Sequence, residues 1–370
     1  MPTRISRRQY LQTALKIGAL APTLTLSGCE ALIRVLGDAC PENPDESAGV
    51  DWTPDVMHPM FYGFQDLGVA EGAPCPVRVW YPSYEGSPEG APILKLCLIR
   101  YPVVLFLHGQ PPCFAADYYT QWFMLPAVLA RSGYVVVVPS YTAVLPDSTE
   151  HPNVALATSA IDWVRNTWEH ARWVDKRATS TAVAGHSYGA LLGARVAQVR
   201  PTISAYVGWS GPWFEFNNAL AVLQTIGCPS FFMWATGDAL KAAFEDLDGG
   251  GGVWNQLTTR RYAAVFPGEH FDYLRASSSF CSGTPRGSCT LIEAVAAELA
   301  ALFITRHVPV ANSTTQIPVT LVPPTVTLTQ KQQFFAGAHL NGIEQIKTRT
   351  GCSIDLKWND GGTGSRHLGP

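Results

Sequence analysis

The chain has 370 residues, of which 47% are apolar and 15% are charged, and its formal net charge is −3. A chain of this length and composition can bury a substantial core, so we expect a globular protein and not an intrinsically disordered one. The first 28 residues carry four basic and no acidic side chains, and the acidic remainder has no basic run. We therefore expect no nucleic-acid partner.

The first 28 residues have the pattern of an export signal and are expected to lie outside the fold. Residues 6–12 (SRRQYLQ) resemble the twin-arginine export signal, and the mostly apolar stretch 17–26 that follows is too short for a lasting transmembrane helix. It ends in Leu-Ser-Gly-Cys29, which resembles a bacterial lipobox, so we expect cleavage before Cys29 and lipid attachment to its sulfur. Ordinary secretory cleavage beside an incidental cysteine is the alternative. The mature protein is thus predicted to be exported and lipid-anchored to a membrane of the bacterial cell envelope, periplasmic or at the cell surface.

Eight cysteines follow Cys29, and an even number in an exported chain suggests disulfides. We expect Cys281 and Cys289 to form a pair, whereas free buried thiols are the alternative for Cys97 and Cys228, which lie beside apolar runs. The cysteines lack the C-x-x-C spacing of zinc and redox sites, and the chain has no HExxH motif. Neither a metal nor another cofactor is implied.

Residues 30–60 contain four prolines and no sustained period, which indicates a spacer. Strand and helix patterns then alternate. The run 101–107 (YPVVLFL) is fully apolar, as expected for a central parallel strand that is covered on both faces. Strands are predicted at 76–82, 101–107, 134–139, 180–184, 203–209, 230–235 and 262–266, and helices at 118–132, 154–172, 190–199 and 291–303. This alternation predicts an α/β fold with a doubly wound, mostly parallel sheet.

The most informative stretch is 180–194 (STAVAGHSYGALLGA). A short β-favouring run meets a G-x-S-x-G pentapeptide at 185–189, and an alanine-rich helical pattern follows at once. This is the setting of a nucleophile elbow, in which glycines leave room where strand and helix approach each other. Ser187 is therefore the candidate nucleophile, and a serine in an ordinary strand-to-helix turn is the alternative. His186, inside the elbow, is expected to pack beside it and not to catalyse.

With His108-Gly109 after the preceding apolar strand, and an acid and a histidine further along in the right order, the chain resembles an α/β-hydrolase over residues 60–306. Within that superfamily, PVRVWYP, YPVVLFLHG and GHSYGA resemble the group that contains platelet-activating-factor acetylhydrolases, chlorophyllase, dienelactone-hydrolase-like proteins and cutinase-like polyester hydrolases. The resemblance divides the chain into a signal segment (1–28), a spacer (29–59), a hydrolase domain (60–306) and a C-terminal extension (307–370).

A serine hydroxyl is a weak nucleophile, so a histidine must accept its proton and a carboxylate must orient that histidine. His270 follows the last predicted strand in a glycine-containing loop, where the resemblance implies the catalytic histidine. Asp238 follows the predicted strand 230–235 after Thr236 and Gly237. This position is at the carboxyl edge of the sheet, where catalytic groups collect. The rival acids, two near His270 in sequence and two shortly after Asp238, are Glu269, Asp272, Asp246 and Asp248.

The oxyanion formed during acyl transfer needs backbone N–H donors. We expect one from Tyr188, directly after the nucleophile, and one from Gln110 in the loop after His108-Gly109. Pro111 and Pro112 have no N–H to donate, which favours Gln110.

Trp209, Trp213 and Phe214 lie at or just beyond the end of the strand between elbow and acid. The resemblance implies a hydrophobic substrate-binding wall there, but aromatic residues at a strand end also serve as core, and both interpretations stay open. The sequence is interpreted as a serine hydrolase of small-molecule, lipid or polyester carboxylic esters, and it does not indicate an oligomeric state. The same triad would serve an acyltransferase, a perhydrolase or a peptidase, and a non-catalytic binding lipoprotein is the contrasting class.

About twenty residues separate Trp209 from Ser230, which is room for a loop and one short helix but not for an inserted cap domain. We therefore expect an open cleft. After Arg306 the sequence becomes rich in Pro, Thr and Val, and then indicates a short helix ending near Leu340 and a hairpin at 342–358. No role follows for this extension.

Overall fold

The computed structural model describes residues 61–83, 89–95, 99–109, 119, 124–141, 148–213, 219–238, 240, 254, 257, 259–266, 270, 292–312, 355–359 and 366–368. The chain divides into two units, Met1–Val50 with Lys95–Cys97 and Asp51–Leu94 with Leu98–Pro370, and all the elements below belong to the second. The predicted signal segment, Cys29, and the predicted pair of Cys281 and Cys289 lie outside the described residues.

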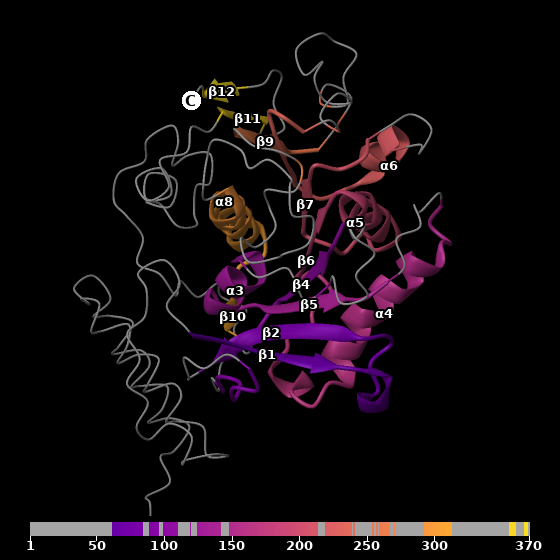
Figure 1. Ribbon diagram of the computed structural model, residues 1–370, viewed down its shortest axis with the longest axis vertical. Helices are drawn as coiled ribbons and strands as arrows, with labels where there is room; N and C mark the ends of the chain where they lie inside the picture. Colours follow the sequence, from indigo (N-terminus) through magenta and orange to yellow (C-terminus); the bar gives the residue numbers. More distant parts are fainter. Residues whose placement is uncertain are drawn as a thin grey trace, which may run out of the picture. The chain divides into compact units, whose positions relative to one another are not determined.

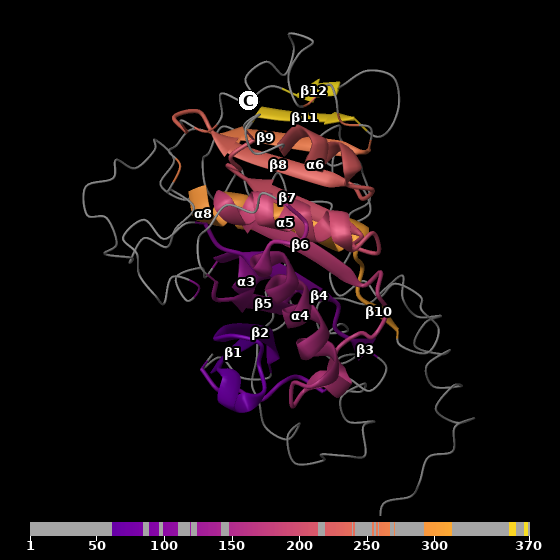
Figure 2. The same cartoon turned by 90° about the vertical axis from the view of Figure 1, so that its right-hand side faces the viewer.

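A mixed sheet forms the centre of the described part (Figures 1 and 2). Its strands are β1 (Phe61–Leu67), β2 (Val77–Ser83), β4 (Val103–Leu107), β5 (Val135–Pro139), β6 (Thr181–His186), β7 (Ala205–Trp209), β8 (Ser230–Ala235), β9 (Arg261–Phe266), β11 (Asp355–Asn359) and β12 (Arg366–Leu368). They are ordered β1-β2-β5-β4-β6-β7-β8-β9-β11-β12. The strands from β5 to β9 in this order run parallel, and antiparallel pairs flank them on both sides. Outside this sheet, β3 (Ile99–Arg100) pairs antiparallel with β10 (Ala311–Asn312).

Helices cover both faces of the sheet (Figure 1). On one face α3 (Met124–Arg131) contacts α8 (Ile292–His307), and on the other α5 (Tyr188–Val199) contacts both α4 (Pro152–Asn166) and α6 (Ala219–Thr225). Because the central strands lie between two helical layers, all residues of β4, β5 and β6 are buried, as the unbroken apolar patterns of β4 and β5 predict. This mixed α/β architecture is consistent with the fold expected from the sequence.

Most of the predicted central strands and helices are found within a few residues of their expected positions. Of the helix predicted at 118–132, the structure describes α3 from Met124 to Arg131, and residues 118 and 120–123 lie outside the described residues. The helix predicted at 154–172 ends at Asn166, where the N–H groups of Thr167 and Trp168 both donate to the carbonyl of Trp163. Trp168 is buried 5.6 Å from the ring of Tyr81, and the short 3-10 helix η4 (Ala171–Trp173) follows. The sequence predicted a longer helix because the turn after Asn166 also buries aromatic side chains, so the apolar pattern continues beyond the end of the helix. The stretch 61–67, for which no element was predicted, forms β1, and the 3-10 helix η2 (Val69–Glu71) follows it.

The C-terminal extension contributes to the main sheet. β11 pairs antiparallel with β9, with Asp355 opposite Val265, and β12 pairs with β11. Of the hairpin predicted at 342–358, residues 342–354 lie outside the described residues, and the two described strands of the extension begin at residues 355 and 366. The predicted helix ending near Leu340 lies outside the described residues.

Cys75 and Cys228 are buried free thiols. Burial raises the pKa of Cys75 to about 11 and that of Cys228 to about 12, so both thiols stay protonated at neutral pH. The free-thiol alternative for Cys228 is confirmed.

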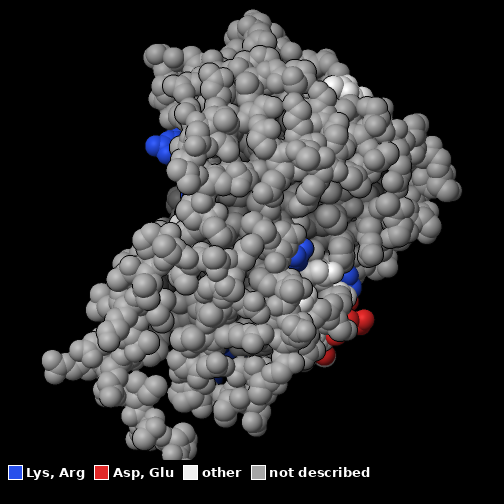
Figure 3. Space-filling view, turned by 90° about the vertical axis from the view of Figure 1, so that its left-hand side faces the viewer, with Lys and Arg blue, Asp and Glu red and all other residues white. Residues whose placement is uncertain are grey.

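On the face in Figure 3 the described basic atoms are scattered and acidic atoms lie next to basic ones, so the residues described there form no single-sign patch. Among the helices of the described part, none combines the length and the hydropathy that a membrane span requires.

Candidate active site

Ser187 occupies a strained turn between β6 and α5. Its φ of 52° and ψ of −124° are rare for a residue with a side chain and cost free energy that the surroundings must compensate. The Ser187 N–H donates to the carbonyl of Trp209 at 2.7 Å, and the Ser187 carbonyl accepts from Ala190 N–H at 2.9 Å. These bonds fix the turn on both sides, and the conformation matches the nucleophile elbow expected from the sequence.

Two glycines allow β4, β6 and α5 to meet at this turn. A Cβ at Gly189 would lie 2.1 Å from the carbonyl oxygen of Leu107, and one at Gly185 would lie 2.2 Å from that of Gly189. Both contacts are with backbone, which cannot move aside as a flexible side chain would. The pentapeptide glycines are therefore required by packing, as the motif predicts.

Asp238 and His270 are brought together from the ends of β8 and β9. The His270 Nδ1 atom lies 3.0 and 3.1 Å from the two carboxylate oxygens of Asp238. The Asp238 side chain is 0% exposed and that of His270 is 18% exposed, so the contact is shielded while the imidazole keeps access to solvent. The rival acids Asp246, Asp248, Glu269 and Asp272 lie outside the described residues.

The surroundings of Asp238 keep its carboxyl group ionised. Burial alone would raise its pKa, but the hydrogen bond and charge of His270, the Ser210 hydroxyl and the Leu240 N–H outweigh burial and lower the pKa below its ordinary value. An ionised carboxylate accepts the Nδ1–H of His270 and leaves Nε2 available as a base.

Ser210 is a site residue that the sequence analysis missed. It is buried just after β7, with a φ of 48°, and its N–H donates to the carbonyl of Met233. Its hydroxyl hydrogen-bonds the Asp238 carboxylate and helps to lower its pKa. A serine directly after a parallel strand, at the edge that also carries the elbow, was the available signal.

His270 lies beside the elbow as well as beside Asp238. Its backbone carbonyl oxygen is 2.9 Å from Nε2 of His186, the neighbour of Ser187, and the two imidazole rings are 4.7 Å apart. The elbow, the acid and the histidine therefore meet at one edge of the sheet, although they come from three different strands.

Of the two expected oxyanion donors, the structure describes Tyr188 but not Gln110. Tyr188 is the first residue of α5, so its N–H belongs to the free amides of a helix N-terminus, and its hydroxyl accepts a 2.6 Å bond from Asn153. Gln110 lies outside the described residues, but a Cβ at its neighbour Gly109 would be 3.0 Å from Cβ of Ser187. The segment that leads to Gln110 thus passes directly against the nucleophile.

His108, before Gly109, is a buried histidine of the same region. Burial lowers its pKa to about 4, so the ring is neutral at physiological pH. It stacks on Tyr141 with ring centroids 4.1 Å apart, and the Tyr141 hydroxyl donates to the His108 carbonyl. These contacts hold the end of β4 in place beside the elbow.

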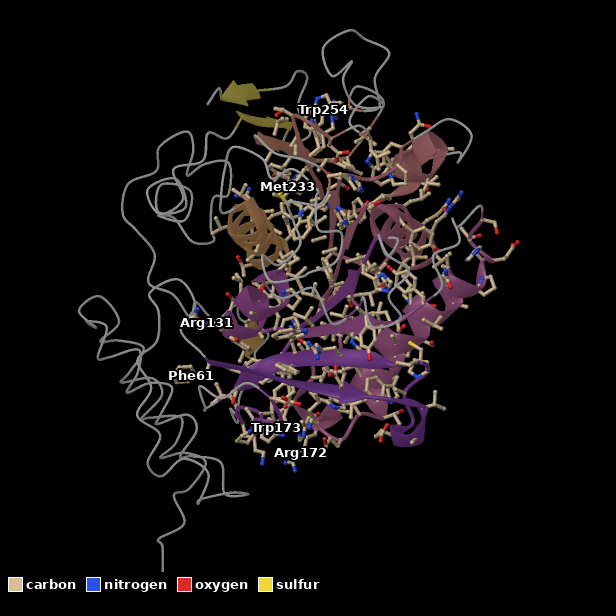
Figure 4. All side chains as sticks on the ribbon, in the orientation of Figure 1. Phe61, Arg131, Arg172, Trp173, Met233 and Trp254 are labelled. Atoms are coloured by element: carbon tan, nitrogen blue, oxygen red, sulfur yellow. The ribbon has the colours of Figure 1, made fainter. Side chains whose placement is uncertain are left out.

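The tryptophans expected at a substrate-binding wall are largely enclosed. Trp209 is 2% exposed and packs 5.8 Å from Phe106, which favours the core interpretation for its ring. Trp213 is 5% exposed and lines a small recess with Phe232 and Met233, whose side chain lies in the interior in Figure 4. Phe214 lies outside the described residues.

The family model described as Chlorophyllase matches residues 97–206, which include the strand before His108, the elbow and helices α3, α4 and α5. Comparison with the curated proteins gave no match. Chlorophyllase is a group within the α/β-hydrolase superfamily, and the match indicates a hydrolase that acts on esters. The resemblance of this chain to the α/β-hydrolase superfamily, and within it to a serine esterase group that includes chlorophyllase, is thereby confirmed.

Proposed function

We propose that the protein is a serine hydrolase that cleaves carboxylic esters through an acyl-enzyme, with Ser187 as nucleophile, His270 as base and Asp238 as the orienting acid. The observation that carries the proposal is the 3.0 Å contact between His270 Nδ1 and the buried Asp238 carboxylate, beside a strained elbow serine. A carboxylate, an imidazole and a hydroxyl in this order are what nucleophilic attack by serine needs.

In the proposed reaction, Ser187 Oγ attacks the carbonyl carbon of the ester while Nε2 of His270 accepts the hydroxyl proton. Asp238 stabilises the imidazolium, and the N–H groups of Tyr188 and Gln110 stabilise the oxyanion of the tetrahedral intermediate. The carbon–oxygen bond to the alcohol then breaks, and the alcohol leaves with the proton from His270. Water, deprotonated by His270, attacks the acyl-enzyme, releases the carboxylic acid and restores the serine hydroxyl.

Labelling with a fluorophosphonate probe tests the nucleophile. We expect Ser187→Ala to abolish both labelling and ester turnover while the protein stays folded, because the acyl-enzyme cannot form. Ser204→Ala is the matched control: the hydroxyl of this serine donates to the backbone carbonyl of Thr179, and its loss should leave labelling unchanged. Full esterase activity of the Ser187→Ala variant would contradict the proposal.

We also propose an open cleft without a cap domain, suited to bulky or extended esters, including lipids and polyesters. In support, the described residues between β7 and β8, 210–213 and 219–229, contain one short helix, α6. Hydrolysis of a soluble short-chain ester should then follow simple saturation. A jump in rate at the solubility limit of the ester would indicate a lid and contradict this part of the proposal.

A further inference from the structure

His186 lies at the carboxyl end of β6, directly before the elbow serine, and is 0% exposed. Its Nε2 atom is 2.9 Å from the backbone carbonyl oxygen of His270. A carbonyl oxygen can only accept a hydrogen bond, so Nε2 must carry the hydrogen and donate it. This contact therefore sets the tautomer of His186.

His270 needs such a contact because it lies four residues beyond the end of β9. Strand pairing fixes β9 up to Phe266, which is opposite Ala235, but does not extend to the histidine. Asp238 fixes the rotation of the His270 ring through Nδ1, whereas the His186 bond fixes the position of the His270 main chain. The two contacts constrain different degrees of freedom of the same residue.

The same buried ring also lies against the turn after β4. A Cβ at Gly109 would be 2.9 Å from Nδ1 of His186, so the imidazole packs directly on this residue. Gly109 precedes the proposed oxyanion donor Gln110. One side chain thus contacts both the segment that carries the base and the segment that leads to the oxyanion donor.

We infer that His186 is a positioning residue of the proposed esterase. Its ring packs on Gly109, and its Nε2–H bond to the His270 carbonyl holds the base in position relative to Ser187 and the oxyanion donors. The inference rests on the proposed function. Among the described residues, the charged or titratable groups that act on His186 include Asp238, His270 and His108.

The neutral state of the ring suits this role. Burial, followed by the nearby positive charge of His270 in its imidazolium form, keeps the pKa of His186 well below its ordinary value. The ring centroids of the two histidines are only 4.7 Å apart. A neutral His186 can therefore donate its hydrogen bond without placing a second positive charge beside the imidazolium that forms on His270 during acylation.

The test compares two variants of similar side-chain length. In His186→Gln an amide N–H can replace the Nε2–H, whereas His186→Met fills the space without a donor. We expect His186→Met to lower kcat by about 10²-fold with little change in KM, as a small misplacement of a catalytic group does, and His186→Gln to recover kcat to within about tenfold of wild type. His307→Met is the matched control, because His307 packs 4.7 Å from Phe303 near the end of α8 and is remote in the chain from the elbow.

The kinetic outcomes separate the inference from the proposed function. If the wild-type protein is labelled by the fluorophosphonate probe, and the His186→Met variant is labelled and turns over the ester at the wild-type rate, the positioning role is wrong but the proposed esterase activity is supported. If both variants lose the same activity, or both lose only thermal stability, His186 is a packing residue. A wild-type protein that neither labels nor hydrolyses esters contradicts the proposed function itself.

A measurement on the wild-type protein keeps the inference testable even where the Met variant fails to fold. The imidazole ¹⁵N spectrum should show His186 as the neutral tautomer with its proton on Nε2. A proton on Nδ1 would leave no donor for the His270 carbonyl and would overturn the inference.

Discussion

Asp238→Asn is the substitution whose effect follows most directly from the geometry. The carboxylate lies 3.0 Å from His270 Nδ1 and its side chain is fully buried. At about 3 Å and an effective dielectric constant of about 20, a carboxylate and an imidazolium attract each other by about 5 kcal/mol. Since about 1.4 kcal/mol corresponds to a factor of ten in rate, losing this attraction in the transition state should lower kcat by about three to four orders of magnitude.

The assay is steady-state hydrolysis of a soluble ester, with unfolding followed in parallel. The matched control is Asp175→Asn, which removes another buried carboxylate, one paired with Arg177. The Asp175 N–H donates to the carbonyl of Tyr101 just before β4, so this carboxylate lies at the amino ends of the parallel strands, whereas the elbow and Asp238 lie at their carboxyl ends. In Figure 4 the nearby Arg172 and Trp173 lie at the bottom of the view, away from Met233 and Trp254. The control should cost stability but leave kcat unchanged. Wild-type kcat in the Asp238→Asn variant, or a larger loss from Glu269→Gln, would refute the assignment of the acid.

Three further predictions concern packing, pH and anchoring. Gly189→Ala should destabilise the fold by about 3 kcal/mol and abolish activity, because the added Cβ would meet the Leu107 carbonyl. In the control Gly227→Ala no atom lies within 4 Å of the added Cβ, so the unfolding free energy should change by less than about 0.5 kcal/mol. The hydrogen bonds and charge of Arg177 lower the pKa of Asp175 below its ordinary 3.8 despite its burial. The contribution of the Asp175 carboxylate to stability is thus complete above pH 3.8 and is lost as the pH falls through the folded-state pKa. Asp175→Asn should therefore reduce the dependence of the unfolding free energy on pH in this acid range. Cys29→Ser should release the protein from membranes or block its processing, and unchanged membrane fractionation with no loss of acyl mass would contradict the lipid anchor.

The parts of the site that the sequence predicted are those encoded by short stretches of chain. The elbow requires a strand, a tight turn and a helix in immediate succession, and the pattern around Ser187 contains all three. Asp238 and His270 could be proposed because each follows a strand pattern, and ends of parallel strands share one edge of the sheet.

The supporting contacts could not be predicted in this way. His186 and His270 are 84 residues apart, and their hydrogen bond depends on how the chain leaves β9. Ser210 reaches Asp238 only because β7 and β8 are neighbours and a positive φ turns its backbone. The position of Ser210 directly after a strand marks the edge of the sheet on which it lies but does not specify its contact with Asp238, since a buried histidine or serine is equally compatible with simple core packing.

The pairing of β11 with β9 has a consequence for how the protein avoids self-association. Without β11, the last parallel strand, Arg261–Phe266, would present an open row of backbone N–H and C=O groups, which is a template for strand addition by a second chain. The distant C-terminal residues 355–359 occupy that row, and β12 adds one more short strand beyond them. A chain shortened after α8 would therefore expose the unpaired edge of β9, and it should be prone to aggregate even where its core and its catalytic residues are intact.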